Sequence, residues 1–297
     1  MKILSYYMAR LRYPQFRDYS DMGLGIEARY LRCKAFWKRH LDFSKSFQEL
    51  ALSGCERRES IAILGAGRLL DMSEQAVSGF RSLHLFDADP TVLPVWKKFE
   101  KNFKSGQVHL HLEDLTRCIS DWSEQLKKFL GSQTRQDASS AAAFLRSLVA
   151  GQANFRGYDV IVSLNVLSQL GVYWRDRVEH ALNTSWNMHS DANGQWPEPL
   201  QAALLESQGK LEQAHLAGLA ASGASLVVLI HDREFFYYTN NRAEWQAEPA
   251  LQCLATDLPG YSVQNSDTWL WHIAPQGIEQ PEYGAIHKVV ATSFRRA

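Results

Sequence analysis

Cysteine is scarce in this chain, and the few thiols are scattered. The 297 residues include only Cys33, Cys55, Cys118 and Cys253, with no Cys-x-x-Cys pair and no Cys/His spacing typical of a metal site. This pattern excludes a disulfide framework and a zinc-finger-like centre, and it is typical of reduced thiols in a cytosol. We therefore expect no metal ion and a cytoplasmic protein.

Net charge is also absent, because 32 basic residues balance 32 acidic ones. A balanced chain lacks the broad positive surface that binds nucleic acid, so we expect no nucleic-acid partner. No apolar run approaches the roughly 20 residues of a membrane span. The first residues, "MKILSYYMARLRYPQF", interrupt any signal-like apolar core with arginines and a proline. Nothing in the sequence gives the oligomeric state.

Residues 26–52 form the first recognisable pattern, with apolar residues at three- and four-residue spacing. These residues are Ile26, Tyr30, Cys33, Trp37 and Leu41. The spacing predicts an amphipathic helix whose other face carries Arg29 and Arg32. We expect residues 1–58 to form an N-terminal helical extension that caps a second domain over residues 59–297.

From residue 61 onward, strand-length apolar runs alternate with segments long enough for helices. The runs are "IAILGAG", "SLHLFDADP", "VHLHLEDL", "YDVIVSLNVL" and "ASLVVLIHD". This alternation predicts a doubly wound α/β fold with a mostly parallel sheet. The last two runs, "TWLWHIAP" and "HKVVATSF", are too close for a helical crossover, so they should pair as an antiparallel hairpin. The expected total is seven strands.

Two connections are longer than the others. Residues 116–157 can hold two helices, and residues 171–198 form a Trp-rich insertion before a helix predicted at 199–222. We expect the insertion to cover part of the molecule.

Ligands of open parallel sheets bind beyond the carboxyl ends of the strands, so the residues there are the site candidates. They are Gly65, Gly67, Asp87, Glu113, Asp114, Asn165, His231 and Asp232. Asp87 lies 20 positions after Gly67 and can accept both ribose hydroxyls of an adenosine cofactor. A nicotinamide dinucleotide is disfavoured, because its third motif glycine would be Leu70. The terminal hairpin also disfavours it.

This succession resembles the class I S-adenosylmethionine-dependent methyltransferases, over roughly residues 60–297. The resemblance implies a Rossmann-like fold in which the loop that begins with Gly65-Ala66-Gly67, here called the glycine loop, packs on the cofactor's methionine part. It also implies that Asp87 binds the ribose and Asp114 the adenine amine. "YDVIVSLNVLSQL" is similar to the family's fourth-strand signature. The implied cofactor-binding residues are Gly65, Ala66, Gly67, Asp87, Ala88, Asp114, Leu115 and Asn165.

Two positions depart from the family pattern. Ile63 stands where an acid is common, and Leu69 replaces the third glycine of Gly-x-Gly-x-Gly. Either other groups hold the methionine amine or the pocket has degenerated. Arg29 and Arg32 could pair with the cofactor carboxylate, or they could form a solvated helix face.

Methyl transfer is an in-line displacement that depends on positioning, and it needs a base only when the acceptor is protonated. The candidate bases are His231 and Asp232, although packing at a strand end is the alternative role for His231. We expect His40 to be structural. Tyr173, Trp174 and Phe235 could line an aromatic acceptor pocket, with core packing as their alternative.

The sequence therefore predicts an S-adenosylmethionine-dependent methyltransferase that acts on a small molecule or a protein side chain, at oxygen or nitrogen. The fourth strand ends in "SLNV" rather than Asn-Pro-Pro-Tyr, and no Pro-Cys pair follows it, which disfavours nucleobase acceptors. Two alternatives stay open: an NAD(P)-dependent oxidoreductase, and a non-catalytic protein that keeps the fold to bind a cofactor.

Overall fold

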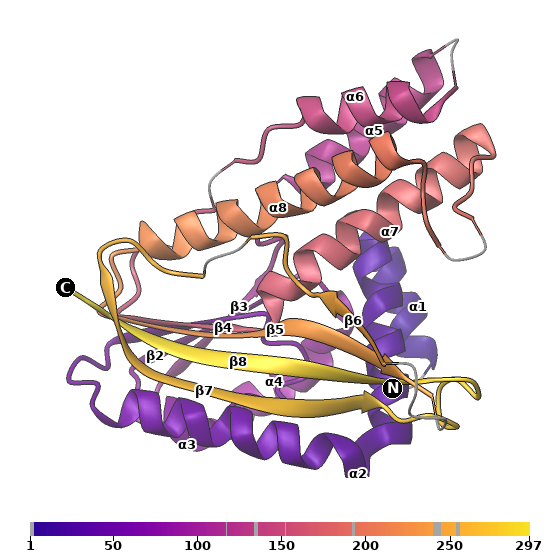
Figure 1. The fold of residues 1–297 in the computed structure, drawn as a ribbon. Coiled ribbons are helices and arrows are strands. Elements are labelled where there is room, and N and C mark those ends of the chain that lie inside the picture. The colour runs from indigo at the N-terminus through magenta and orange to yellow at the C-terminus, as the bar shows by residue number, and fades with distance from the viewer. Residues whose placement is uncertain are drawn as a thin grey trace.

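The computed structural model describes residues 3–116, 118–133, 136–151, 153–191, 194–239, 245–253 and 256–297. Its centre is an eight-stranded sheet with helices on both faces (Figure 1). The strands are β1 (Ser60–Leu64), β2 (Ser82–Asp87), β3 (Gln107–Leu112), β4 (Val160–Leu164), β5 (Leu226–Tyr238), β6 (Trp245–Pro249), β7 (Tyr261–Ala274) and β8 (Gly284–Arg296).

The sheet runs in the order β3-β2-β1-β4-β5-β8-β7, and β6 pairs with β5 off this path. The first five strands are parallel, whereas β8 is antiparallel to both β5 and β7. This confirms the Rossmann-like, mostly parallel sheet with an antiparallel terminal pair. The count of seven strands was wrong, because β6 adds an eighth. The strand order reverses between β1 and β4, which is where such sheets bind ligands.

β1 and β4 are apolar runs buried on both faces, as a central parallel strand requires. β5 begins in the same way, but a register shift between Asp232 and Glu234 lets it continue to Tyr238. The prediction that this strand ends at His231 and Asp232 is therefore wrong. Both residues lie within the strand, where β8 pairs with them.

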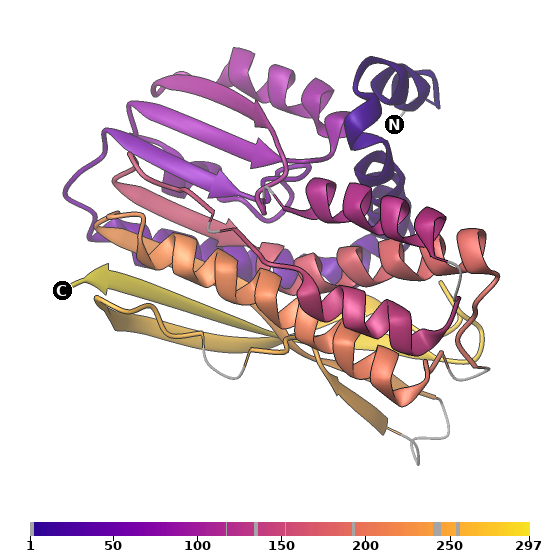
Figure 2. The same cartoon turned by 90° about the horizontal axis from the view of Figure 1, so that it is seen from above.

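One face of the sheet is covered by α2 (Arg17–Ser53), α3 (Glu74–Val77) and α4 (Leu93–Asn102). On the other face lie α5 (Ile119–Ser132), α7 (Val166–Trp186) and α8 (Glu198–Ala220), and α6 (Ala138–Ser147) packs against α8 further from the sheet. Short 3₁₀ turns are η1 (Pro14–Phe16) and η2 (Pro90–Val92). Figure 2 shows α1 (Ile3–Arg12) at the edge where β1, β2 and β3 end. None of the helices described reaches the length and apolarity of a membrane span.

α2 confirms the amphipathic helix predicted at residues 26–52 and is longer at its N-terminal end. Cys33, Trp37 and Leu52 are buried in the same core as the sheet, and Trp37 Nε1 donates to the Ile273 carbonyl at 2.9 Å. The second half of α2 thus packs as an ordinary face helix. The domain boundary at residue 58 stays a prediction.

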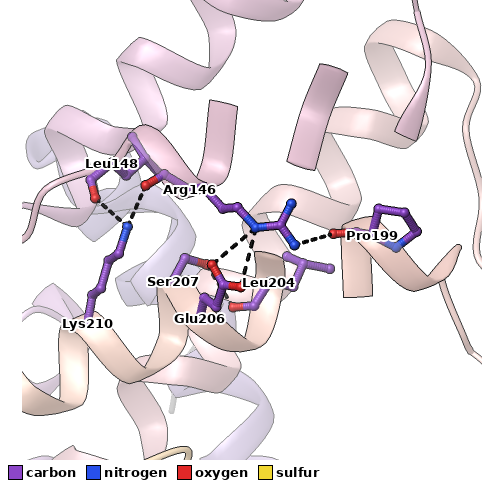
Figure 3. Close-up of polar contacts among 7 residues, drawn as sticks. All are labelled: Arg146, Leu148, Pro199, Leu204, Glu206, Ser207 and Lys210. Atoms are coloured by element: carbon purple, nitrogen blue, oxygen red, sulfur yellow. Dashed lines mark hydrogen bonds and ion pairs between the residues drawn. The ribbon is translucent and has the colours of Figure 1, made fainter. Parts of the chain in front are cut away.

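The long connection over residues 116–157 holds two helices, α5 and α6, as predicted. Lys210 on α8 donates to the carbonyls of Arg146 and Leu148 at 2.7 and 2.8 Å (Figure 3). The last carbonyls of a helix lack N–H partners within the helix, so Lys210 caps the C-terminal end of α6. Arg146 also pairs with Glu206 of α8 at 3.2 Å. These contacts anchor α6 to α8.

The expected insertion at about 171–198 is mostly regular helix. α7 continues through Trp186 and α8 begins at Glu198, and the described residues between them, 187–191 and 194–197, are irregular. Asn187 ends α7 in the left-handed conformation, with φ of 50°. The helix predicted at 199–222 is confirmed as α8.

Candidate active site

A cavity of about 280 Å³ opens at the carboxyl ends of β1, β2, β3 and β4. Seven of the eight residues predicted to bind a cofactor line it: Gly65, Gly67, Asp87, Ala88, Asp114, Leu115 and Asn165. Ala66 is the exception, because it is fully buried and its N–H donates to the Phe86 carbonyl at 3.0 Å. These seven strand-end and loop residues therefore line one continuous cavity, and their role in binding a cofactor stays a prediction.

The loop after β1 has a backbone that favours glycine. Gly65 has φ of +71°, and a Cβ atom there would lie 2.7 Å from the Leu164 carbonyl oxygen and closer still to the Val166 side chain. Leu69, which replaces the third motif glycine, also has a positive φ of 60°. The loop keeps its left-handed position although a leucine must adopt it at some cost in strain.

Asp87 is fixed at the end of β2 by backbone donors. Its Oδ2 accepts from the Gly67 N–H at 2.9 Å and its Oδ1 from the Asp89 N–H at 2.8 Å. Burial raises the pKa of Asp87, and these backbone hydrogen bonds oppose that shift. The result is a rigid carboxylate that faces the cavity beside the glycine loop.

Asp114 has an acceptor to spare. Its Oδ1 accepts from the Thr116 N–H at 2.9 Å and from the Thr116 hydroxyl at 2.7 Å. Its Oδ2 is buried and makes no hydrogen bond of standard geometry among the described residues, although the buried Tyr19 hydroxyl lies near enough for this carboxylate to help raise the pKa of Tyr19. A buried acceptor without a donor is costly, so this atom fits a ligand that brings an N–H group.

The N-terminal part of α2 covers this region. Tyr19 stacks on Tyr173 of α7 with ring centroids 4.2 Å apart, and Glu27 pairs with Arg68 of the glycine loop at 3.0 Å. Gly23 lies against the Asp89 carboxylate so closely that a Cβ atom would clash with it. Burial, followed by the charge of Asp87, raises the pKa of Asp89 to about 7.

The cavity also reaches residues that the sequence did not indicate. His40 and Trp271 both line it, with their rings stacked 4.0 Å apart. The Trp269 indole donates to His40 Nδ1 at 3.0 Å, so Nε2 carries the proton of the neutral ring. Burial lowers the pKa of His40 to about 4. The structural role expected for His40 is thus incomplete, because it is also part of the cavity wall.

The two predicted bases lie behind the wall. His231 is 1% exposed, and its Nδ1–H donates to the Asp232 carbonyl at 2.9 Å. The Asp232 carboxylate accepts from Ser168 and lies 3.2 Å from His287 Nδ1. Neither residue lines the cavity, because β5 continues past them. Their catalytic role stays a prediction.

The predicted aromatic pocket is only partly assembled. Tyr173 lines the cavity, whereas the Trp174 indole donates to Ser207 of α8 and Phe235 packs on His287. Trp174 and Phe235 are absent from the cavity wall because one faces the helix layer and the other lies on the extension of β5.

The basic helix face differs from expectation too, since Arg29 and Arg32 both pair with Glu279.

The lining is strongly acidic. Among the described residues it includes five carboxylates, from Asp71, Asp87, Asp89, Glu113 and Asp114, against one guanidinium, from Arg68. Such a site favours a cation and disfavours the pyrophosphate of a dinucleotide. In the part of the chain that the structure describes, no group of His, Cys, Asp and Glu has the geometry of a metal site.

No protein-family model matches the chain, and no curated protein matches it in sequence. Solved structures with a similar fold include magnesium protoporphyrin IX methyltransferase from Synechocystis PCC 6803 with bound SAM. Its identity is 10% over 87% of this chain and 80% of that one, with a TM-score of 0.35.

N-methyltransferase NodS from Bradyrhizobium japonicum, in complex with S-adenosyl-L-homocysteine, is 11% identical over 86% of each chain, with a TM-score of 0.32. TehB from Haemophilus influenzae is 9% identical over 85% of this chain and 62% of that one, with a TM-score of 0.39. Matches at this level do not identify a reaction, so its assignment depends on the residues of the cavity.

Proposed function

We propose that the protein is an S-adenosylmethionine-dependent methyltransferase that methylates oxygen or nitrogen of a small molecule or a protein side chain in the cytoplasm. The observation that carries the proposal is one cavity lined by Asp87, which accepts from the Gly67 N–H, and by Asp114, whose Oδ2 makes no hydrogen bond of standard geometry among the described residues. The cofactor's adenosine brings the hydroxyl and amino donors that these two carboxylates require.

The residues at this part of the cavity, which we call the adenosine end, are Asp87, Ala88, Asp114 and Leu115. Asp87 would accept from the ribose hydroxyls, and Asp114 Oδ2 from the adenine amine. Leu115, with little of its surface exposed, offers an apolar contact for the base. Tyr19 and Gly23 of α2 would exclude water above it.

S-adenosylmethionine supplies an electrophilic methyl group on a positively charged sulfonium. The acidic lining supports this cofactor over a nicotinamide dinucleotide, whose pyrophosphate would bring further negative charge into a cavity that five carboxylates already line. Leu70, at the place of the third dinucleotide glycine, also lines the cavity and would crowd the phosphates. Orientation of the acceptor is then the main contribution of the protein, because His231 and Asp232 lie behind the wall.

The test is calorimetric titration of the full chain with S-adenosylmethionine, S-adenosylhomocysteine and NAD, using wild-type protein and Asp114→Asn. We expect micromolar binding of the first two ligands and none of NAD. Asp114→Asn should weaken both by roughly tenfold or more, because the buried carboxylate is the stronger acceptor. Asp121→Asn, an exposed change on α5, is the matched control and should bind like wild type.

NAD binding in place of S-adenosylmethionine would contradict the proposal and favour the oxidoreductase alternative. Binding of S-adenosylmethionine without turnover of any small-molecule or peptide acceptor would favour the non-catalytic alternative.

A further inference from the structure

The proposed cofactor carries an ammonium group on its amino-acid part. Ile63, at the position where an acid is common, has no side-chain acceptor for this group. Ile63 is fully buried in the core between β1 and its neighbours. A carboxylate from further along the same loop reaches the cavity instead. Asp71 lines it, near the turn that joins β4 to α7.

Asp71 and Asn165 form a joined pair at that turn. Asp71 Oδ2 accepts from Asn165 Nδ2 at 3.1 Å, and both residues line the cavity. Asn165 Oδ1 is buried and has no partner in the described ranges of the chain. An ammonium group has three N–H donors, so it can satisfy this oxygen and the Asp71 carboxylate together.

The pair is held in place from two sides. The Asp71 carbonyl accepts from Gln48 Nε2 at 2.7 Å and from the Ser44 hydroxyl at 3.2 Å, both on α2. Asn165 adopts the left-handed conformation with φ of 54°, and its N–H donates to the Ile230 carbonyl at 2.7 Å. Gly65 lies against the same turn, since a Cβ atom there would clash with Val166. The two acceptors are therefore preorganised beside the glycine loop.

Burial destabilises the charged form of the Asp71 carboxylate, so a bound cation would stabilise it. Burial raises the pKa of Asp71 to about 6, and Asp87 adds to the shift while Lys45 and the Asn165 hydrogen bond oppose it. A bound ammonium group would offset the desolvation of the carboxylate, whereas an apolar ligand group would leave it uncompensated.

We propose that Asp71, together with Asn165, holds the α-ammonium group of S-adenosylmethionine in place of the acid that Ile63 has replaced. This inference rests on the proposed function. It names a binding site for a primary ammonium group, which we call the amino-acid end of the cavity, defined by Asp71 and Asn165.

The test is a binding cycle that changes the ligand and the protein separately. The ligands are S-adenosylhomocysteine and its analogue with hydrogen in place of the α-amino group. The proteins are wild type, Asp71→Asn and, as a matched change at the adenosine end, Asp114→Asn. Calorimetry measures all six affinities, and circular dichroism checks that each variant is folded.

We expect removal of the amino group to weaken binding to wild type by roughly 10- to 100-fold, the range for a hydrogen bond to a charged group. In Asp71→Asn the same removal should have less than about a threefold effect, because the charged partner is already lost and only the neutral Asn165 Oδ1 remains. Asp114→Asn should weaken both ligands equally and keep the wild-type ratio between them.

An unchanged ratio in Asp71→Asn would overturn the inference and leave the proposed function intact. If that variant does not fold, the wild-type comparison still decides, because equal affinity for the two ligands would exclude an ammonium site. If wild type binds neither ligand, the proposed function fails and this inference with it.

Discussion

The adenosine end and the amino-acid end of the cavity are assembled from different kinds of segments. At the adenosine end, Asp87 and Asp114 follow directly from strands β2 and β3, and short backbone bonds fix them. At the amino-acid end, Asp71 lies inside a loop and depends on α2 and α7 for its position. Strand ends and the backbone next to them position the adenosine end, whereas the amino-acid end also needs the packing of α2 against the loop that carries Asp71.

The largest expected effect comes from Gly65, where the two ends meet. Gly65→Ala should lower the free energy of unfolding by roughly 2–5 kcal/mol, because it adds left-handed strain and a steric clash in a packed site. Gly25→Ala is the matched control, since a Cβ atom there meets nothing within 4 Å. Urea unfolding measures both, and equal stability of the two variants would show that the Gly65 turn relaxes freely.

A change at His40 should have a smaller effect on stability and should leave the adenosine end unaffected. His40→Phe keeps a ring on Trp271 but leaves the buried Trp269 N–H without its acceptor. We expect a loss of about 1–3 kcal/mol of stability with unchanged affinity for adenosine alone. Thermal unfolding and calorimetry test this. The control is His272→Phe, because His272 is exposed on β7, the strand that carries Trp269 and Trp271. Weaker adenosine binding by His40→Phe would mean that the wall and the adenosine end are one coupled unit.

Acid should weaken the amino-acid end selectively. Asp71 has a raised pKa of about 6, so below pH 6 it holds a proton that must leave before it can pair with an ammonium group. The affinity ratio of S-adenosylhomocysteine to its desamino analogue should fall roughly tenfold from pH 8 to pH 5. Asp87 lies at the adenosine end and Asp89 lies close to it in the chain, so their direct effects on the two ligands largely cancel in the ratio. A ratio that is flat with pH would contradict an ionised Asp71 partner.

The smallest effect is expected outside both ends. Arg32 pairs with Glu279 on the surface, together with Arg29. Arg32→Gln should leave S-adenosylhomocysteine affinity within about twofold and the melting temperature within about 2 °C, because exposed ion pairs contribute little. A clear loss of affinity would instead support the idea that this arginine holds the cofactor carboxylate.

The sequence predicted the parallel sheet and its antiparallel pair, and it indicated the strand-end residues that line the cavity, because each depends on local runs such as "SLHLFDADP". It could not predict where β5 ends. A register shift after Asp232 extends that strand, and only its pairing with β8 and β6 reveals this. Because the strand was expected to end at His231 and Asp232, these residues were expected to line the cavity, whereas they lie inside β5 and do not line it.

The wall formed by His40 and Trp271 was missed for another reason. One residue belongs to α2 and the other to β7, more than 200 positions apart in the chain. On the helix, His40 follows the same spacing as the core residue Trp37, so a packed role was the simpler interpretation. Asp71 had a weaker signal still, as an acid after the glycine loop with no strand end next to it.

The unbroken course of α2 has a mechanical consequence. From Cys33 onward the helix is clamped in the core, while Tyr19 and Gly23 lie over the cavity. The distance from Cys33 to Tyr19 along the helix axis is about 21 Å at 1.5 Å per residue. A tilt of about 10° around Cys33 would therefore swing Tyr19 by roughly 4 Å, comparable to the thickness of an aromatic ring. Because the buried part of α2 sets the direction of its N-terminal part, we expect repacking around Cys33 to alter access to the cavity without any change in the residues that line it.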